Sequence, residues 1–143
     1  MSGPASARVD AAKGLFADTP AGPRLLGSRC ATCGTPYFPR TSACRNPACS
    51  RSDLRDAEFG PRGRLISVAL QNYPPPAPTI APQPYRPYGV GLVDLPEGLR
   101  VIGRLASDAP EQVPLGGPVE LVIAPLGRDG EGREVLSWQW RPL

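Results

Sequence analysis

The sequence contains no histidine among its 143 residues and no apolar run long enough to cross a membrane. Histidine is the side chain that most often serves as a general base near neutral pH, so acid–base and nucleophilic catalysis have no obvious residues here. Asp94 and Glu97 are a candidate carboxylate pair, but both flank a predicted turn, where acidic side chains usually bond to local backbone amides. We therefore expect no catalytic residue, and a protein that is not an enzyme on its own.

The beginning of the chain also lacks the features of a secretory signal. Its first twelve residues are polar or small, without an apolar stretch behind a basic start. The expected compartment is therefore the cytoplasm, where reducing conditions keep cysteine thiols free. No contact with a membrane is expected.

Four cysteines stand in two short pairs, a C-x2-C pair at Cys30 and Cys33 and a C-x4-C pair at Cys44 and Cys49. Two such pairs can place four thiolates at the corners of a tetrahedron, and thiolate is a preferred ligand of zinc. Gly34 follows the first pair, where the turn needs a residue that tolerates a positive φ. With no histidine available, we predict a closed, structural Zn²⁺ site with these four cysteines as ligands.

Two other uses of the cysteines stay open at this point. A tetrathiolate site could hold iron, as in a rubredoxin-like electron carrier. The cysteines could also form two disulfides, although the expected compartment disfavours them.

The charge of the chain is close to neutral once the metal is counted. The formal net charge is +3, and fifteen of the sixteen basic residues are arginine. Four thiolates and one Zn²⁺ together contribute two negative charges, which leaves about +1. A strongly basic surface for nucleic acid is therefore not expected.

We divide the chain into three parts. Residues 1–23 form an N-terminal arm, in which the spacing of Val9, Ala12 and Phe16 predicts a short helix over residues 9–17. Residues 24–58 form a rubredoxin-like zinc ribbon, a segment small enough to need its metal. Residues 59–143 form a β domain.

The β domain has five runs typical of strands, at residues 63–70, 89–95, 100–105, 119–124 and 135–140. Turn residues at 96–98 and 127–132 predict antiparallel hairpins between the second and third runs and between the last two. The prolines and glycines of residues 107–117 argue against a helix there. The predicted class is mainly β, with a five-stranded OB-fold barrel and an SH3-like barrel as the alternative.

Residues 73–88 contain seven prolines and three tyrosines. Such a segment favours extended polyproline II, so we expect a stiff loop that stands clear of the barrel. It serves either as a docking surface or as a spacer that blocks pairing at a sheet edge. Trp138 and Trp140 alternate on the last predicted strand, which places both on one face for packing.

The order of these parts resembles the acyl-CoA-associated OB-fold proteins with an N-terminal rubredoxin-like zinc ribbon, a family that accompanies thiolases and lipid-transfer-protein-like ketothiolases or aldolases. The resemblance runs from about residue 24 to residue 143. The motifs that carry it are Cys30-x2-Cys33-Gly34, Tyr37-Phe38-Pro39-Arg40, Cys44 with Cys49, Gly63-Arg64-Leu65, Pro87-Tyr88-Gly89-Val90, Asp94-Leu95-Pro96-Glu97-Gly98-Leu99-Arg100-Val101 and Gly103-Arg104-Leu105.

The resemblance implies a non-catalytic accessory subunit that binds a thiolase-superfamily enzyme and supports its use of acyl-CoA. The enzyme would supply the catalytic residues, the two proteins would form a heterotetramer, and the coenzyme A thioester would be shared between them. Guanidinium groups bind phosphates bidentately and tyrosine stacks on adenine. We therefore name five candidates for contact with CoA or the partner: Arg40, Arg45, Tyr85, Arg86 and Tyr88.

A competing function is the binding of single-stranded nucleic acid, because a zinc ribbon joined to an OB-fold is also found in such proteins. The near-neutral charge argues against it. So do the mostly aliphatic residues predicted for the binding face, 89–105.

Overall fold

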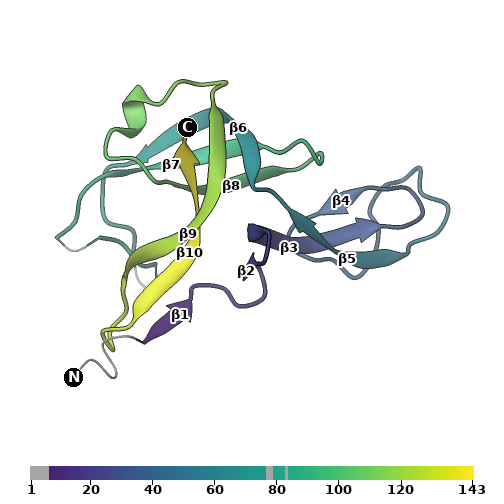
Figure 1. Ribbon diagram of the computed structural model, residues 1–143, viewed down its shortest axis with the longest axis horizontal. Coiled ribbons are helices and arrows are strands. Elements are labelled where there is room, and N and C mark those ends of the chain that lie inside the picture. Colours follow the sequence, from purple (N-terminus) through teal and green to yellow (C-terminus); the bar gives the residue numbers. More distant parts are fainter. Residues whose placement is uncertain (1–6, 77–78, 83) are drawn as a thin grey trace.

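The computed structural model describes residues 7–76, 79–82 and 84–143 (Figure 1). Nearly all of its regular structure is β-strand, as predicted, and no helix in these residues is long and apolar enough to cross a membrane. The elements are β1 (Arg8–Asp10), β2 (Phe16–Thr19), β3 (Gly22–Cys30), β4 (Pro36–Tyr37), β5 (Leu54–Phe59), β6 (Arg62–Gln71), β7 (Tyr88–Asp94), β8 (Arg100–Leu105), the 3₁₀ helix η2 (Pro110–Gln112), β9 (Pro118–Arg128) and β10 (Glu134–Pro142).

Strands β6 to β10 close into a five-stranded barrel. β6, β7 and β8 form an antiparallel meander. β10 pairs parallel with β8 and antiparallel with β9, and β9 returns to β6 to close the barrel. The five predicted strands correspond to these five, and the OB-fold prediction is confirmed.

Alternation along the strands decides which side chains fill the barrel. On β8, Val101, Gly103 and Leu105 are buried, whereas Arg100 and Ile102 are exposed. A side chain at Gly103 would place its Cβ 2.8 Å from Nε1 of Trp140 and 2.9 Å from Nε1 of Trp138. Glycine is therefore required there, because the two indoles pack directly over its backbone.

Both predicted hairpins are present. β7 and β8 pair from Asp94 with Arg100 onward, and β9 and β10 pair from Arg128 with Glu134 onward. The connection between β8 and β9 contains only the single turn of η2, consistent with its prolines and glycines.

The predicted helix over residues 9–17 is wrong. Residues 8–10 form β1, which pairs parallel with β10, and residues 16–19 form β2, which pairs antiparallel with β3. A spacing of three and four residues fits one helix face, but so short a helix is marginal alone. Pairing with distant strands is more favourable than a short helix, so β1 joins the barrel sheet and β2 joins the ribbon sheet.

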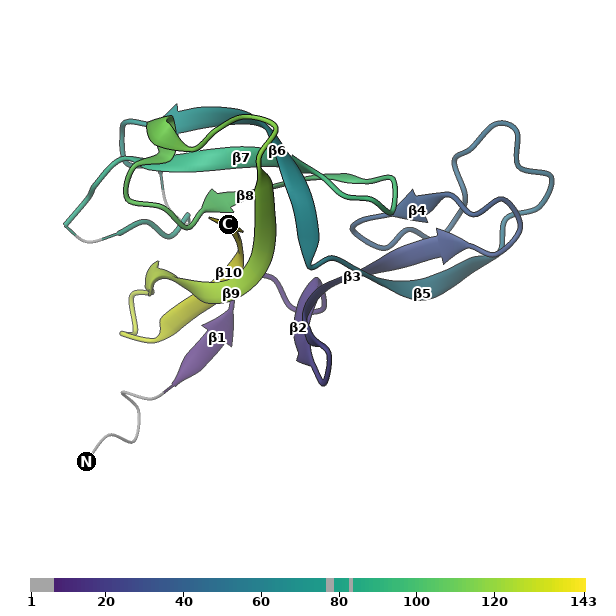
Figure 2. The same ribbon diagram turned by 45° about the horizontal axis from the view of Figure 1, so that its top comes forward.

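The zinc-ribbon segment forms the second sheet around β3. β5 runs along one edge of β3 from Leu25 to Cys30, while β2 and β4 pair with different stretches of the other edge. Figure 2 shows β3 and β5 extending together from the barrel toward the tip of the ribbon. The chain passes from β5 to β6 within two residues, Gly60 and Pro61.

One apolar core joins the ribbon to the barrel. Phe16, Leu25 and Phe59 come from strands of the ribbon sheet and pack in the same cluster as barrel residues such as Leu65 and Trp140. The ribbon base is therefore not a separate hydrophobic unit. The bounds at residues 24–58 and 59–143 remain predictions.

The proline-rich loop does not stand clear of the barrel, contrary to expectation. Ala81 is buried, and a Cβ at Gly127 of β9 would lie 2.9 Å from the carbonyl oxygen of Ala81. The Tyr85 hydroxyl donates hydrogen bonds to the carbonyl oxygens of Gln71 and Tyr73. These contacts fold the described part of the loop back onto β6 and β9.

Candidate metal centre

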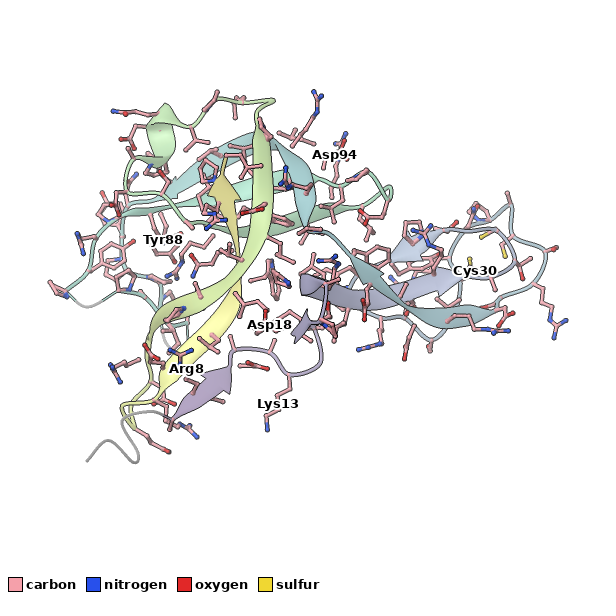
Figure 3. The ribbon with its side chains drawn as sticks, in the orientation of Figure 1. Arg8, Lys13, Asp18, Cys30, Tyr88 and Asp94 are labelled. Atoms are coloured by element: carbon pink, nitrogen blue, oxygen red, sulfur yellow. The ribbon has the colours of Figure 1, made fainter. Side chains whose placement is uncertain are left out.

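The four cysteine side chains meet at the tip of the ribbon, far from the barrel (Figure 3). Their sulfur atoms all lie within 4.8 Å of one another. The Sγ atoms of Cys30 and Cys49 are 3.7 Å apart, and those of Cys33 and Cys44 are 3.6 Å apart. Sulfurs of a tetrahedral zinc site with bonds of about 2.3 Å would be separated by about 3.8 Å, so the cluster fits this ion.

The backbone of the first pair forms a tight turn around this position. Cys30 ends β3, and its carbonyl oxygen accepts a hydrogen bond from the N–H of Gly34 at 2.7 Å. The N–H of Cys30 donates to the carbonyl oxygen of Thr35 at 3.0 Å. Gly34 has a φ of 80°, as the sequence predicted for the residue after the second ligand.

The second pair forms a wider turn that Asn46 organises. The N–H of Cys49 donates to the carbonyl oxygen of Asn46 at 3.0 Å, and the side-chain oxygen of Asn46 accepts from the N–H of Ala48 at 3.0 Å. Its side-chain nitrogen donates to Oγ1 of Thr35 at 3.0 Å, which ties the two turns together. Sequence reasoning missed Asn46, although asparagine inside a turn is a usual sign of such bonding.

Polar groups also lie directly against the sulfurs. The Tyr37 hydroxyl is 3.3 Å from Sγ of Cys44 and accepts the N–H of Arg45 at 2.6 Å. Oγ1 of Thr35 is 3.1 Å from Sγ of Cys33. The hydrogen bond between the Tyr37 hydroxyl and Cys44 raises the pKa of Tyr37, so the phenol stays protonated and can donate to a thiolate. The sequence indicated Tyr37 only as part of the Tyr37-Phe38-Pro39-Arg40 motif.

The electrostatics of the cluster favour a bound cation. The backbone of Cys33 lowers the pKa of the Cys30 thiol to about 6. The backbone of Arg51 also lowers the pKa of Cys49, but burial and the other three cysteines outweigh it and raise that pKa to about 12. Four thiolates this close repel one another, and a metal ion among them would offset that repulsion and let all four ionise.

The cluster does not form disulfides. All four cysteines are free, and their closest sulfurs are 3.6 Å apart, against about 2.05 Å for a disulfide bond. Four protein ligands would complete the coordination of zinc and leave no position for a substrate or water. The arrangement fits a structural metal.

Besides the shared core, aromatic contacts and a side-chain hydrogen bond connect the ribbon and the linker after it to the barrel. The rings of Phe16 and Phe38 pack edge-on against Trp138 of β10, with centroids 5.9 and 5.4 Å away. Glu97, in the β7–β8 turn, accepts the N–H of Gly60 through Oε2 at 3.2 Å. Glu97 therefore bonds a distant backbone amide at the junction, and not the local turn amides that the sequence led us to expect.

Both parts of the chain match models of one protein family. Residues 20–55 match the rubredoxin-like zinc ribbon domain of ChsH2, and residues 56–124 match the C-terminal OB-fold domain of ChsH2. A DUF35 domain-containing scaffold protein of Methanothermobacter thermautotrophicus is 33% identical over 108 residues, which cover 75% of this chain and 77% of that protein. The chain belongs to the ChsH2 (DUF35) family. The predicted family and its two-part architecture are thus confirmed.

Two further similarities within the ChsH2 family concern subunits of larger enzymes. The benzoylsuccinyl-CoA thiolase subunit BbsA of Thauera aromatica is 31% identical over 121 residues, covering 85% of this chain and 78% of BbsA. A solved structure of an Ltp2-ChsH2(DUF35) aldolase contains a chain that is 31% identical, with a TM-score of 0.63. That similarity covers 83% of this chain and 84% of the other.

The five candidates for CoA or partner contact fall into two groups. Arg40 and Arg45 lie on the ribbon, where Arg40 is held by Asp56 at 3.0 Å and by the carbonyl oxygen of Gly14 at 2.7 Å. Tyr85, Arg86 and Tyr88 lie in or beside the proline-rich loop. In Figure 3, Tyr88 and Cys30 are at opposite ends of the molecule, so the structure does not bring the two groups together.

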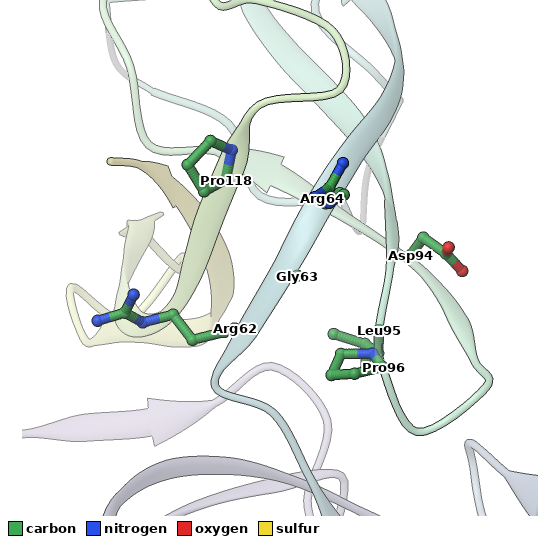
Figure 4. Close-up of a pocket in the computed structure, with 7 residues that line it drawn as sticks. All are labelled: Arg62, Gly63, Arg64, Asp94, Leu95, Pro96 and Pro118. Carbon is green, nitrogen blue, oxygen red and sulfur yellow. The ribbon is translucent and has the colours of Figure 1, made fainter.

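A groove of about 340 Å³ lies on the barrel between β6 and the β7–β8 hairpin (Figure 4). Its lining is mostly apolar, with exposed arginines on the β6 side. Arg62 is 3.6 Å from Glu120, and Asp94 is 3.7 Å from Arg100, so these two charged groups at its rim already have partners. The lining residues are Arg62, Gly63, Arg64, Asp94, Leu95, Pro96 and Pro118.

Proposed function

We propose that this chain is a non-catalytic, zinc-binding subunit of a thiolase-superfamily enzyme, a ketothiolase or an aldolase that acts on acyl-CoA. The observation that carries the proposal is the gathering of all four cysteines into one ligand cluster in a chain without histidine. No thiol nucleophile or imidazole base is then left for acyl transfer. The reacting groups must come from another polypeptide.

The named relatives support the same division of labour. BbsA is a subunit of a thiolase, the Ltp2-ChsH2 protein is an aldolase, and the archaeal relative is a scaffold protein. We carry this role over to the present chain and place it in the cytoplasm, in a heterotetramer with two copies of each subunit. Zinc, held by Cys30, Cys33, Cys44 and Cys49, would supply rigidity to the ribbon tip.

We further propose that the two groups of candidate residues have separate tasks. Arg40 and Arg45 would contact the partner from the ribbon, where Arg45 sits on the metal loop. Tyr85, Arg86 and Tyr88 would lie nearer to acyl-CoA. Arg86 is exposed and makes no hydrogen bond to the described residues, whereas Tyr85 and Tyr88 are partly buried.

Co-expression with a thiolase-superfamily protein from the same genome tests the proposal. We expect co-elution, a mass by light scattering that fits two copies of each chain, and turnover of acyl-CoA by the complex alone. Alanine at all five candidate residues should weaken the complex or raise its KM for acyl-CoA. Turnover of an acyl thioester by this chain alone would overturn the proposal. Binding of single-stranded oligonucleotide without any enzyme partner would favour the competing function instead.

A further inference from the structure

Arg104 on β8 is a half-buried arginine that sequence reasoning quoted only as part of a motif. Its Nη1 donates to the carbonyl oxygen of Leu126 at 3.1 Å, and its Nη2 donates to that of Ile80 at 3.0 Å. The guanidinium carbon lies 3.9 Å from the centre of the Tyr88 ring. The side chain therefore sits between the barrel and the proline-rich loop.

The charge of Arg104 has no counter-charge in the chain. No carboxylate of the described residues forms an ion pair with it, and residues 1–6, 77–78 and 83 include no aspartate or glutamate. Both hydrogen-bond acceptors are neutral carbonyls, which engage two of the five N–H groups of a guanidinium. Burial lowers the pKa of Arg104, which reflects the loss of water around the cation. Arg104 thus has neutral partners, two carbonyl oxygens and the Tyr88 ring, but no counter-ion, and a partly desolvated cation of this kind is often found in ligand sites.

A groove of about 460 Å³ is lined in part by Arg104. Arg128 lines it as well, with one of its nitrogens donating to the carbonyl oxygen of Gly132 at 2.8 Å. Glu134 is the one acidic residue of the lining, and Arg8 pairs with it at 2.9 Å. The groove is therefore positive, and its remaining lining residues are Pro82, Pro125, Leu126 and Gly127.

We propose that this groove binds the phosphate group of a small phosphate ester, with Arg104 and Arg128 as its ligands. Guanidinium groups present paired N–H donors that match phosphate oxygens, and such charge-assisted bonds are among the stronger ones in proteins. Inorganic phosphate, a nucleotide and coenzyme A all offer this group. Because Arg104 contacts Tyr88, which we propose to lie near acyl-CoA, the assignment of CoA as the ligand rests on the proposed function. Binding of inorganic phosphate or a nucleotide by this chain alone does not rest on it.

The competing explanation is purely structural, with Arg104 joining the loop to β9 and binding no anion. Titration calorimetry on the zinc-loaded full chain separates the two, with inorganic phosphate, ADP and CoA as ligands at constant ionic strength. We expect saturable binding of at least one of them and none of chloride. Tighter binding of CoA than of ADP would identify CoA as the source of the phosphate, and equal binding would show that a nucleotide suffices.

Three variants test the assignment of residues. Arg104→Met and Arg128→Met should each weaken phosphate-ester binding by about tenfold or more, the usual effect of losing a charged hydrogen bond. Arg100→Met is the matched control, because Arg100 is an exposed arginine on the same strand outside the groove, and it should bind as the parent does. If Arg104→Met does not fold, Arg128→Met decides the matter, since Arg128 is exposed and outside the loop contact.

Absence of saturable binding by the parent chain would overturn the proposal, as would unchanged binding in both groove variants. Binding of a single-stranded oligonucleotide more tightly than CoA, and dependent on Arg104, would replace the small ester with nucleic acid.

Discussion

The tip of the ribbon, residues 31–53, and the barrel are held together by different physical means. None of the residues in the tip is buried, and its order depends on hydrogen bonds between turns and on four sulfurs that converge on one point. The barrel, in contrast, encloses Leu65, Val93 and Trp140 with almost no exposed surface. Metal binding must therefore determine the fold of the tip, whereas apolar burial determines that of the barrel.

Removal of the metal should have the largest effect, because it should unfold the tip and leave the barrel folded. Zinc contributes an apparent 10–16 kcal/mol or so in small zinc-finger peptides, far more than a segment without buried residues can gain otherwise. We expect a chelator, or Cys44→Ser, to abolish the dispersed amide NMR signals of residues 31–53 while those of the barrel persist. Ser42→Ala, an exposed change in the same loop, is the control. An intact tip without bound metal would refute the assignment.

A truncation in the apolar core should destabilise the barrel and not the tip of the ribbon. Trp140 is fully buried, so Trp140→Ala should lower the free energy of unfolding by about 3–5 kcal/mol. Urea denaturation followed by fluorescence of the remaining tryptophan measures this. Leu143→Ala, at a residue 55% exposed, should change it little. If the ribbon kept its zinc after the barrel had unfolded, the two regions would be more independent than we expect.

The aromatic contact at the junction offers a test of coupling between the regions. Trp138→Ala removes two edge-on ring contacts and the hydrogen bond from Nε1 to the carbonyl oxygen of Ile102. We expect a loss of about 2–3 kcal/mol, with zinc retained. Hydrogen exchange should increase more at Leu25 and Phe59 than at Val93. Equal increases at all three positions would show that the junction and the barrel open together, and Trp138→Phe should preserve most of the contact.

The smallest expected effect concerns acid sensitivity of the β9–β10 turn. The backbone of Arg133, and then its side chain, lower the pKa of Asp129, which accepts the N–H groups of Glu131 and Arg133. A lowered pKa in the folded state means that this stabilisation is complete above the unfolded value of about 3.9 and is lost as the pH falls through the folded value. Asp129→Asn should therefore flatten the dependence of the urea midpoint on pH below about 4. An unchanged acid dependence would contradict this role.

The sequence predicted the barrel well because its strands carry local signals. Period-two burial on β8 and the turn residues at 96–98 can be recognised without knowing the fold. The metal ligands were equally accessible, because cysteine spacing alone limits what they can do. Asn46 and Tyr37 needed the structure, since their partners on the neighbouring turn and cysteine are fixed only after the loop closes.

The missed elements depend on contacts between distant residues. β1 and β2 exist because Val9 pairs with Val135 and Phe16 pairs with Leu25, neither of which short-range periodicity can indicate. The folded-back loop likewise depends on a distant contact, the hydrogen bond from Arg104 to the carbonyl oxygen of Ile80. In the sequence, Arg104 has the pattern of an ordinary polar residue on an alternating strand. The positions of Arg40 and Tyr88 relative to each other likewise emerge only from the three-dimensional arrangement.

The single cluster formed by Phe16, Leu25, Phe59 and the barrel side chains has a consequence for dissecting the molecule. Cutting the chain between β5 and β6 would leave each fragment with half of an apolar surface facing water. Neither piece would then report how the intact protein behaves. Swapping ribbons among relatives should succeed only when the strands beneath the metal loop are exchanged together with the barrel residues they touch.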